Sequence, residues 1–425
     1  MDQLKLLNFH KMIAYFANNL VGAFVSLIIF QTTGKISLAF IYLFANYVLR
    51  LLLTLSLKKL YGKYPQLFLL LRIIPITLYN IFIFILDANI IVGIIGICIF
   101  NSLDNALNNL SKEIIFNYSS LSKKSENSSI GATRLFEQIG KIIALLIGGY
   151  LLDLNRTLVV ILSIIIYAIS VVPLVIFYIK SRKQKTFNKD ATSNAITTLN
   201  KKDELKAESK KLTSKLLWTY FLVYFSFAFV DVLTTTYNLF IFQQKGQFAT
   251  AGILTAVFDC FYAIGFYIAG KVNEKKDTTI LVSIFSIIIS VCVIALPFID
   301  IDRLFILICV IYGTIAFSNT FISIFVLDRM LTKSRIMACS NKALYMRETG
   351  CIVAYCVAYS FGLIGPLAIF IVIAITMFSS SALIPIGEEK TRQHLVDYLQ
   401  NNEKINRKKN VRKKKNIAKA NSNAN

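Results

Sequence analysis

Charged residues and histidine are scarce in this chain, and their scarcity excludes whole classes of protein. Charged residues make up 16% of the chain against 56% hydrophobic residues, which gives a mean hydropathy of +0.63. A typical soluble domain carries about 25% charged residues. The only histidines are His10 and His394, so the chain has neither a zinc-binding histidine cluster nor a His-Glu-x-x-His motif. We therefore expect neither a soluble domain nor a zinc site.

The motifs of two further enzyme classes are also missing. An ATP-driven pump needs a Gly-x4-Gly-Lys-Ser/Thr loop to cradle phosphate, and Gly34-Lys35-Ile36 lacks both the upstream glycine and the hydroxyl. The Gly-x-Ser-x-Gly elbow of serine hydrolases does not occur. The seven cysteines lie in or near apolar stretches without a pairing pattern, so we expect buried, reduced thiols. We therefore expect no enzyme and no bound cofactor or metal.

Long apolar stretches fill the chain instead. About 20 apolar residues cross a hydrocarbon core about 30 Å thick, and only a helix satisfies its own backbone hydrogen bonds there. The sequence therefore predicts an all-α polytopic membrane protein of twelve transmembrane helices. We place them at residues 8–30, 37–57, 65–86, 89–110, 130–152, 157–179, 215–241, 248–270, 278–298, 303–326, 343–361 and 363–385.

A repeated pentapeptide divides these stretches into two sets of six. Phe-Gln-Thr-Thr-Gly at 30–34 ends the first stretch, and Phe-Gln-Gln-Lys-Gly at 242–246 ends the seventh, 212 residues later. Such duplication is typical of transporters built from two parallel halves. We predict two pseudo-symmetric six-helix lobes. The predicted segments are an N-terminal lobe at 1–180, a linker at 181–213, a C-terminal lobe at 214–386 and a tail at 387–425.

The net charge of +23 follows the topology of the predicted helices. About 37 of the 46 lysines and arginines lie at the N-terminus, in the even-numbered turns or in the tail. Positive loops stay in the cytoplasm, so we expect both termini and the linker there. The tail is predicted to be a basic, disordered segment attracted to anionic lipid; the alternative is a solvated tail shaped by a low-GC genome. The charge therefore gives no reason to expect a nucleic-acid partner.

The turn after the eighth stretch carries a family resemblance. Gly270-Lys-Val-Asn-Glu274-Lys275-Lys resembles the Gly-x-Leu-x-Asp-Arg motif of the major facilitator superfamily, although its first-half counterpart at 57–64 has Lys59 in the place of the acid. In that family the acid and bases of the motif form a gate-locking network at the inner face. The alternative is an ordinary short basic turn. The resemblance implies a transporter whose lobes alternate in access.

The fifth stretch carries a second, partial resemblance. Gly140, Gly148 and Gly149 match the ends of a glycine-rich motif of the family's antiporters, but Ala144-Leu145 replaces its central Gly-Pro. This match favours export. The alternative is that small residues let two helices approach closely.

Polar and ionisable residues inside the predicted helices are the candidate site residues, because charge is costly in the membrane and usually functional. Candidates for substrate binding or proton coupling are Asn19, Asp231, Asp259, Lys141, Glu137, Gln138 and Glu348. Candidates for a gate or charge network are Arg50, Arg72, Asp104, Arg134, Gly270, Glu274, Lys275 and Arg347. Candidates for helix packing are Gly140, Gly148 and Gly149.

Two interpretations of these charges stay open. Protonation of Asp231, Asp259 or Glu137 would couple a proton gradient to rocking of one lobe against the other. Alternatively, each acid is a paired structural charge, with Glu137 bridging Arg134 or Lys141 by their helical spacing. Arg50 would likewise bind a substrate anion or stabilise a gate.

The predicted function is secondary active transport of a small solute by alternating access. Asp231 and Asp259 outweigh Lys141 near the midplane, which favours a cationic or amphiphilic solute, and the partial motif of the fifth stretch favours its proton-driven efflux. One alternative is an importer or facilitator of a sugar, peptide or other nutrient, and another is a membrane sensor, lipid translocator or assembly partner. We expect a multi-pass monomer in the plasma or inner membrane, with a small solute and the lipid bilayer as its partners. The first stretch is expected to serve as its own insertion signal.

Overall fold

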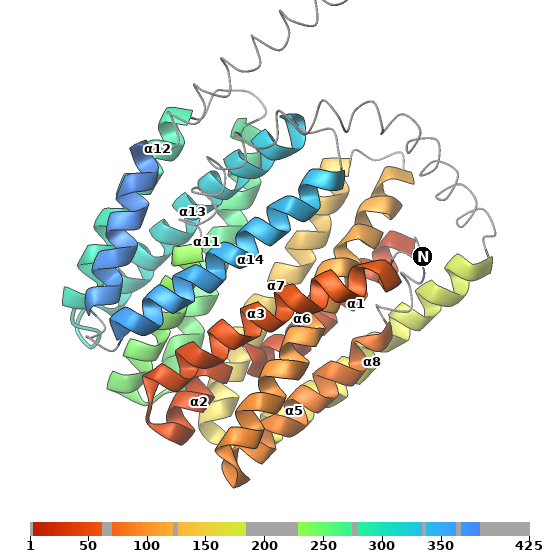
Figure 1. Cartoon of the computed structure of the whole chain (residues 1–425), viewed down its shortest axis with the longest axis horizontal. Coiled ribbons are helices and arrows are strands. Elements are labelled where there is room, and N and C mark those ends of the chain that lie inside the picture. The colour runs from red at the N-terminus through yellow and green to blue at the C-terminus, as the bar shows by residue number, and fades with distance from the viewer. Residues whose placement is uncertain are drawn as a thin grey trace, which may run out of the picture.

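The computed structural model describes residues 3–61, 70–121, 126–183, 228–273, 279–333, 337–362 and 367–382. Across these ranges the chain is almost entirely helical and contains no strand. Long helices lie side by side in one bundle (Figure 1). The prediction of an all-α membrane protein is confirmed for this part of the chain.

Each predicted apolar stretch overlaps a helix of the described residues. The N half consists of α1 (Gln3–Gly22), α2 (Val25–Thr33), α3 (Ile36–Tyr61), α5 (Ile73–Ala88), α6 (Ile90–Leu121), α7 (Glu126–Leu154) and α8 (Arg156–Lys183). The C half consists of a helix over 228–245, α11 (Phe248–Asn273), α12 (Thr279–Ala295), a 3-10 turn (Leu296–Phe298), α13 (Phe305–Lys333), α14 (Met337–Gly362) and the helix Leu367–Ala382. Seven helical segments of the described part are long and apolar enough to cross a membrane.

The first apolar stretch differs from the prediction of a single helix. α1 ends at Gly22 and α2 begins at Val25, with Phe24 N–H bonded to Val21 O at 2.9 Å across the break. Glycine is a poor helix former, and a Cβ at Gly22 would lie 3.3 Å from the Tyr79 hydroxyl oxygen. The two helices still form one apolar span, Leu6–Thr33.

The repeated pentapeptide adopts the same conformation twice. Gly34 and Gly246 have φ angles of 68° and 66°, and the N–H groups of both donate to the phenylalanine carbonyl four residues earlier at 2.7 Å. This is the left-handed C-cap that glycine adopts without strain. Both copies lie at the same end of the bundle, because the rings of Phe30 and Phe242 are in edge contact at 6.3 Å. We call this end the glycine-turn end.

Within the described residues, two pairs of long helices pack along each other between the N half and the C half. α7 packs along α11, and α3 packs along α14 (Figure 1). Gly149 and Gly252 bring the backbones of α7 and α11 into close contact, since an added Cβ would lie 2.7 Å from Phe248 O and 2.5 Å from Leu145 O respectively. Gly140 and Gly148 do the same between α7 and α1, where added Cβ atoms would lie 2.3 and 2.6 Å from carbonyl oxygens. The candidate packing glycines therefore all lie at backbone contacts.

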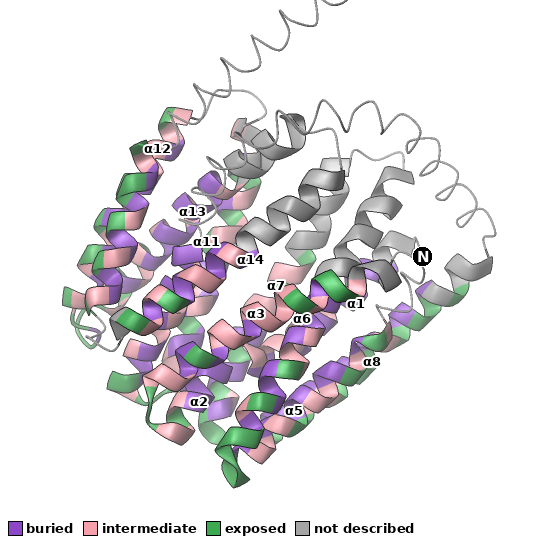
Figure 2. Cartoon of the chain, viewed as in Figure 1, coloured by how far each residue is buried: buried purple, intermediate pink, exposed green. Residues whose placement is uncertain are grey.

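The outer surface of the bundle is apolar. Ile91, Ile280 and Ile306 are 71%, 76% and 80% exposed, and exposed positions recur along α8 and α12 (Figure 2). Large exposed apolar surfaces mark contact with membranes or partners, and the span lengths favour the membrane here. Cys260 and Cys356 also lie on exposed positions, so the expectation that the thiols are buried is wrong for these two. Their helices direct them away from the packed interior.

Candidate functional site

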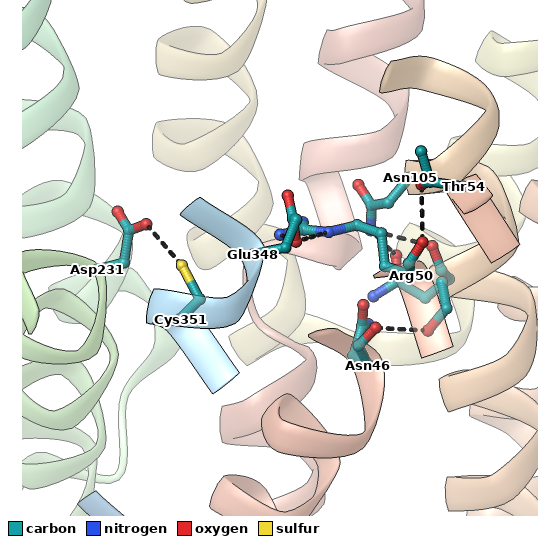
Figure 3. A network of polar contacts seen from close by, with 9 residues as sticks. Asn46, Arg50, Thr54, Asn105, Asp231, Glu348 and Cys351 are labelled. Atoms are coloured by element: carbon teal, nitrogen blue, oxygen red, sulfur yellow. Dashed lines mark hydrogen bonds and ion pairs between the residues drawn. The ribbon is translucent and has the colours of Figure 1, made fainter. Parts of the chain in front are cut away.

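An ion pair joins α3 to α14 across the two halves. Arg50 Nε donates to Glu348 Oε2 at 2.6 Å, and Arg50 Nη2 donates to the same oxygen. The Glu348 side chain is 4% exposed and that of Arg50 14%. The guanidinium carbon lies 4.0 Å from the centre of the Tyr47 ring, within the range of a cation–π interaction. Figure 3 shows Arg50 reaching across to Glu348 from its own helix.

A second ion pair joins α7 to α11. Lys141 Nζ lies 3.0 Å from Asp259 Oδ1 and 2.9 Å from Oδ2. The Asp259 side chain is 6% exposed, whereas that of Lys141 is 29% exposed. Both interfaces between the halves therefore contain an ion pair made of candidate residues from the sequence.

The two ion pairs have the same polarity but occupy different positions of the repeat. In each pair the cation belongs to the N half and the acid to the C half. The position 212 residues after Arg50 holds Tyr262, and the position 210 residues after Lys141 holds Cys351. The charges are thus absent from the equivalent positions of the other half, so the ion pairs break the pseudo-symmetry of the fold.

Asp231, in the helix over 228–245, contacts α14 one helical turn away from the ion pair of Arg50 and Glu348. Cys351 Sγ lies 3.9 Å from Asp231 Oδ2, the range of a weak thiol hydrogen bond. Cys351 follows Glu348 by three residues on α14, and Figure 3 shows Asp231 and Arg50 approaching this stretch of α14 from opposite sides. On the next turn the Tyr355 ring packs against Tyr47 at 5.2 Å. Three acids of the C half and two cations of the N half therefore lie at the interface of the halves.

Amide and hydroxyl groups continue from Arg50 between α3 and α6. The Tyr42 hydroxyl oxygen accepts from Asn101 Nδ2 at 2.6 Å and from Asn46 Nδ2 at 3.4 Å. Asn105 Nδ2 donates to Asn101 Oδ1 at 3.0 Å. Buried polar groups need such partners, so this network fixes the helix that carries Arg50. Tyr42 was not among the predicted site residues, although it lies one turn before Asn46 on the same face of α3.

A separate charge network lies inside the N half. Lys11 Nζ on α1 lies 3.0 Å from Glu137 Oε1 on α7, and the Lys11 side chain is completely buried. Glu137 thus has an ion partner that the spacing along α7 did not predict, while Lys141 pairs with Asp259. Lys11 was not among the predicted site residues, because cations near the N-terminus were expected to mark only the topology.

Arg72 and Asp104 form the second pair of this network. Arg72 Nε and Nη2 donate to the two Asp104 carboxylate oxygens at 2.8 and 3.1 Å, a bidentate arrangement. Arg72 Nη1 also donates to Asn108 Oδ1 at 3.0 Å, and Asn108 Nδ2 donates to the Tyr15 hydroxyl at 3.1 Å. Arg72 and Asp104 therefore hold α6 to the start of α5 within the N half, away from the interface.

The remaining candidates lie in various places. Asn19 is half-buried on α1, and its Nδ2 donates to Tyr15 O at 2.8 Å. The Gln138 Oε1 atom is buried without a hydrogen-bond partner among the described residues. Gly270 lies in α11. Glu274 and Lys275, together with the side chains of Arg134 and Arg347, fall outside the described part of the chain. The described residues contain no group of three or more metal-ligand side chains.

The fold resembles those of solved membrane transporters. The nucleoside transporter NupG has a TM-score of 0.67 and 13% identity, with 91% of this chain and 99% of that chain covered. A POT family transporter in complex with a thioalcohol-conjugated peptide has a TM-score of 0.66 and 12% identity, with 91% and 96% covered. A bacterial homologue of the iron transporter ferroportin has a TM-score of 0.67 in its inward-facing state, with 11% identity and 92% and 98% covered. A bacterial homologue of ferroportin in an outward-facing state has a TM-score of 0.63 and 12% identity.

Family membership follows from the sequence comparison. No curated protein matches the chain by sequence. The family model described as Major Facilitator Superfamily matches residues 9–338, which is most of the chain. The helices, the two joined halves and the structural relatives agree with this match. The chain belongs to the Major Facilitator Superfamily, and it is a multi-pass membrane transporter and not an enzyme.

Proposed function

We propose that the chain is a proton-coupled secondary transporter that moves a small solute by alternating access. In this proposal twelve helices form two six-helix lobes, 1–180 and 214–386, which rock about the two interfaces of α7 with α11 and α3 with α14. The overlap of every predicted stretch with a described helix supports the count of twelve. The repeated left-handed glycines support the division into two lobes.

The single observation that carries proton coupling is the ion pair at each interface. Alternating access requires the lobes to separate at one end at a time. Leaving one member of a buried ion pair without its partner costs about 3 to 5 kcal/mol, and less where a side chain is as exposed as that of Lys141. Protonation of Asp259 or Glu348 removes the negative charge and with it most of the attraction. A proton that reaches these acids therefore makes separation of the lobes easier.

The balance of charges supports a cationic or amphiphilic solute. Asp231, Asp259 and Glu348 face the interface from the C half, against Arg50 and Lys141 from the N half. Among these five described side chains the sum is one negative charge, which a cationic solute neutralises. The rings of Tyr47 and Tyr355 add aromatic faces beside Arg50. The glycines of α7, which resemble an antiporter motif, favour efflux as the direction.

A second candidate function is import of a nutrient. The structural relatives named above are a nucleoside transporter, a POT family transporter in complex with a conjugated peptide, and a bacterial homologue of an iron transporter, and such nutrient solutes favour this candidate. Their identities of 11 to 13% carry the fold and not the substrate. Flux direction under a fixed proton gradient separates the two candidates.

The proposed orientation places both termini and the linker at 181–213 in the cytoplasm of a cell with a plasma or inner membrane. The glycine-turn end then faces outward, and the distribution of lysine and arginine supports this. Contacts between the halves at that end support an inward-facing state, as does the higher TM-score to the inward-facing ferroportin homologue. The basic tail at 387–425 is proposed to lie against anionic lipid.

The test is flux in proteoliposomes that contain the purified full-length protein. We expect an imposed pH gradient to drive movement of a fluorescent organic cation, and Asp259→Asn to reduce that flux at least tenfold. Asp300→Asn is the matched control, because Asp300 is an acid of the same half whose side chain is 52% exposed and whose described partners, Arg303 and the N–H of Asp302, lie in its own turn. Gradient-driven uptake of a neutral nutrient instead would favour the import function. Absence of flux for both the organic cation and the neutral nutrient under the imposed pH gradient would refute transport as the function.

A further inference from the structure

A carboxylate of the N half caps a helix of the C half. Asp153 lies in the last turn of α7, and its Oδ1 accepts from the N–H of Phe248 at 2.8 Å. Its Oδ2 accepts from the N–H of Ala249, also at 2.8 Å. These two N–H groups begin α11, and they lie 95 and 96 residues from Asp153 along the chain. The contact therefore joins the two halves at the glycine-turn end.

Helix chemistry explains why a carboxylate suits this position. The first N–H groups of a helix have no partner within it, and they carry the positive end of the helix dipole. The usual cap comes from the residue before the helix. Here that residue is Gln247, whose Oε1 accepts from the Thr250 hydroxyl at 3.2 Å. The cap for Phe248 and Ala249 comes from the other half of the molecule.

The equivalent helix of the N half begins differently. α3 starts after the first copy of the pentapeptide, and there Leu38 N–H donates to Lys35 O at 3.2 Å. Lys35 N–H donates to Thr33 Oγ1 at 3.3 Å. Both contacts are local to that turn. The position 210 residues after Asp153 holds Leu363, so the sequence offers no second carboxylate there.

The packing of α7 on α11 makes the cap sensitive to lobe position. The two helices run antiparallel, with Gly149 against the backbone of Phe248 and Gly252 against that of Leu145. Further along, Lys141 meets Asp259 about three turns, or roughly 18 Å, from Asp153 along α7. Both partners of the cap lie at the end of their helices. Any rocking that opens the glycine-turn end separates them.

We propose that Asp153 is a conformational latch that stabilises the state in which the glycine-turn end is closed. It is a positioning residue, and its cap is made in that state and lost when the end opens. The inference rests on the proposed alternating access, because a fold with a single conformation has no equilibrium to shift. Loss of the carboxylate shifts the population toward the state that is open at this end.

The latch can be tested by measuring the distance between the halves at the glycine-turn end. Genetically encoded spin labels at Ile91 and Ile306 would report this distance. The two residues lie in the first turns of α6 and α13 at this end, and their side chains are 71% and 80% exposed. The measurement uses the full chain in lipid nanodiscs. We expect Asp153→Ala to raise the ratio of long to short distances roughly three- to tenfold, the effect of removing a helix cap. Asp153→Asn, which keeps one acceptor, should give a smaller shift in the same direction.

Asp300→Ala provides the matched control. Asp300 is an acid at the same end, and its Oδ1 accepts from the N–H of Asp302 within its own turn at 2.9 Å. It makes no described contact with the N half. Equal distance distributions for the Asp153 and Asp300 variants would overturn the latch. A shift confined to the Asp153 variants would support it.

The outcomes for the latch and for transport are separable. If no solute moves in proteoliposomes while the Asp153 variants still shift the distances, the transport proposal fails and the latch stands. If flux follows the pH gradient while the distances are unchanged by Asp153→Ala and Asp153→Asn, the latch fails and transport stands. Thermal unfolding of each variant shows whether it is folded. If Asp153→Ala is not folded, the test relies on Asp153→Asn.

Discussion

Arg50 of α3 and Glu348 of α14 lie 298 residues apart in the chain and share a hydrogen bond of 2.6 Å. Glu348 is nearly buried, and the ring of Tyr47 lies over the guanidinium of Arg50. A buried ion is stable only while it is paired and hydrogen-bonded. The polar contact between α3 and α14 therefore depends on the charge of one carboxylate.

Glu348→Ala should lower the free energy of unfolding by about 3 kcal/mol, because it leaves the Arg50 guanidinium without its carboxylate. The double variant Arg50→Met with Glu348→Leu should recover most of this loss, since apolar side chains of similar size need no ion partner. Unfolding in mixed detergent micelles measures both. A double variant as unstable as Glu348→Ala would show that the loss comes from packing and not from the unpaired charge.

Exchanging the charges of Lys141 and Asp259 tests the other interface. Lys141→Asp alone places two acids together and should weaken the contact between α7 and α11. The double exchange, Lys141→Asp with Asp259→Lys, restores opposite charges and should recover the thermal stability of the wild type to within about 1 kcal/mol. The thermal midpoint of purified protein is the measurement. Equal destabilisation by the single and double variants would mean that the 2.9 Å contact contributes no attraction.

The pair of Lys11 and Glu137 decides between the two interpretations of Glu137. If Glu137 is a paired structural charge, Lys11→Met alone should be destabilising by about 3 kcal/mol, and Lys11→Met with Glu137→Gln should restore stability and keep pH-driven flux. If Glu137 carries the proton, the double variant should fold but lose that flux. The side chain of Lys11 is completely buried and that of Glu137 is 13% exposed. We expect the structural outcome, since both residues belong to the N half and do not bridge the interface.

The helices and the repeat were predictable because their signals are local. Apolar runs of spanning length identify membrane helices, and the glycine that ends each pentapeptide is the residue that a left-handed cap requires. The break between Gly22 and Val25 was missed, because hydropathy does not register a change of backbone direction inside an apolar run. The family resemblance came from the turn at 270–276, of which residues 274–276 lie outside the described part of the chain, and from the glycines of the fifth stretch.

The pairing of the charges was not predictable from one sequence. Arg50, Lys141, Asp259 and Glu348 were all marked as unusual for a membrane helix, but their partners lie 118 and 298 residues away. Which helices meet is decided by packing of the whole bundle, whereas helical spacing suggests only partners three or four residues away. Lys11 and Asp153 were missed for other reasons. Lys11 was counted with the N-terminal cations as a topology signal, and Asp153 lies in the last turn of α7, where a charge normally needs no explanation.

The variants Gly252→Ala and Gly34→Ala distinguish two costs of replacing a glycine: a steric clash between helices at Gly252 and backbone strain at Gly34. A methyl group at Gly252 would lie 2.5 Å from the carbonyl oxygen of Leu145, so α7 and α11 must move apart. A methyl group at Gly34 meets nothing within 4 Å, but its φ of +68° disfavours alanine. We expect Gly34→Ala to lower the free energy of unfolding by about 1 kcal/mol, and Gly252→Ala by about 1 to 3 kcal/mol. Gly252→Ala should also lengthen the distance between labels at Ile91 and Ile306, because the methyl group pushes α7 away from α11 close to the cap that Asp153 makes. An unchanged distance in Gly252→Ala, with the stability loss intact, would show that α7 and α11 accommodate the methyl group without opening the glycine-turn end.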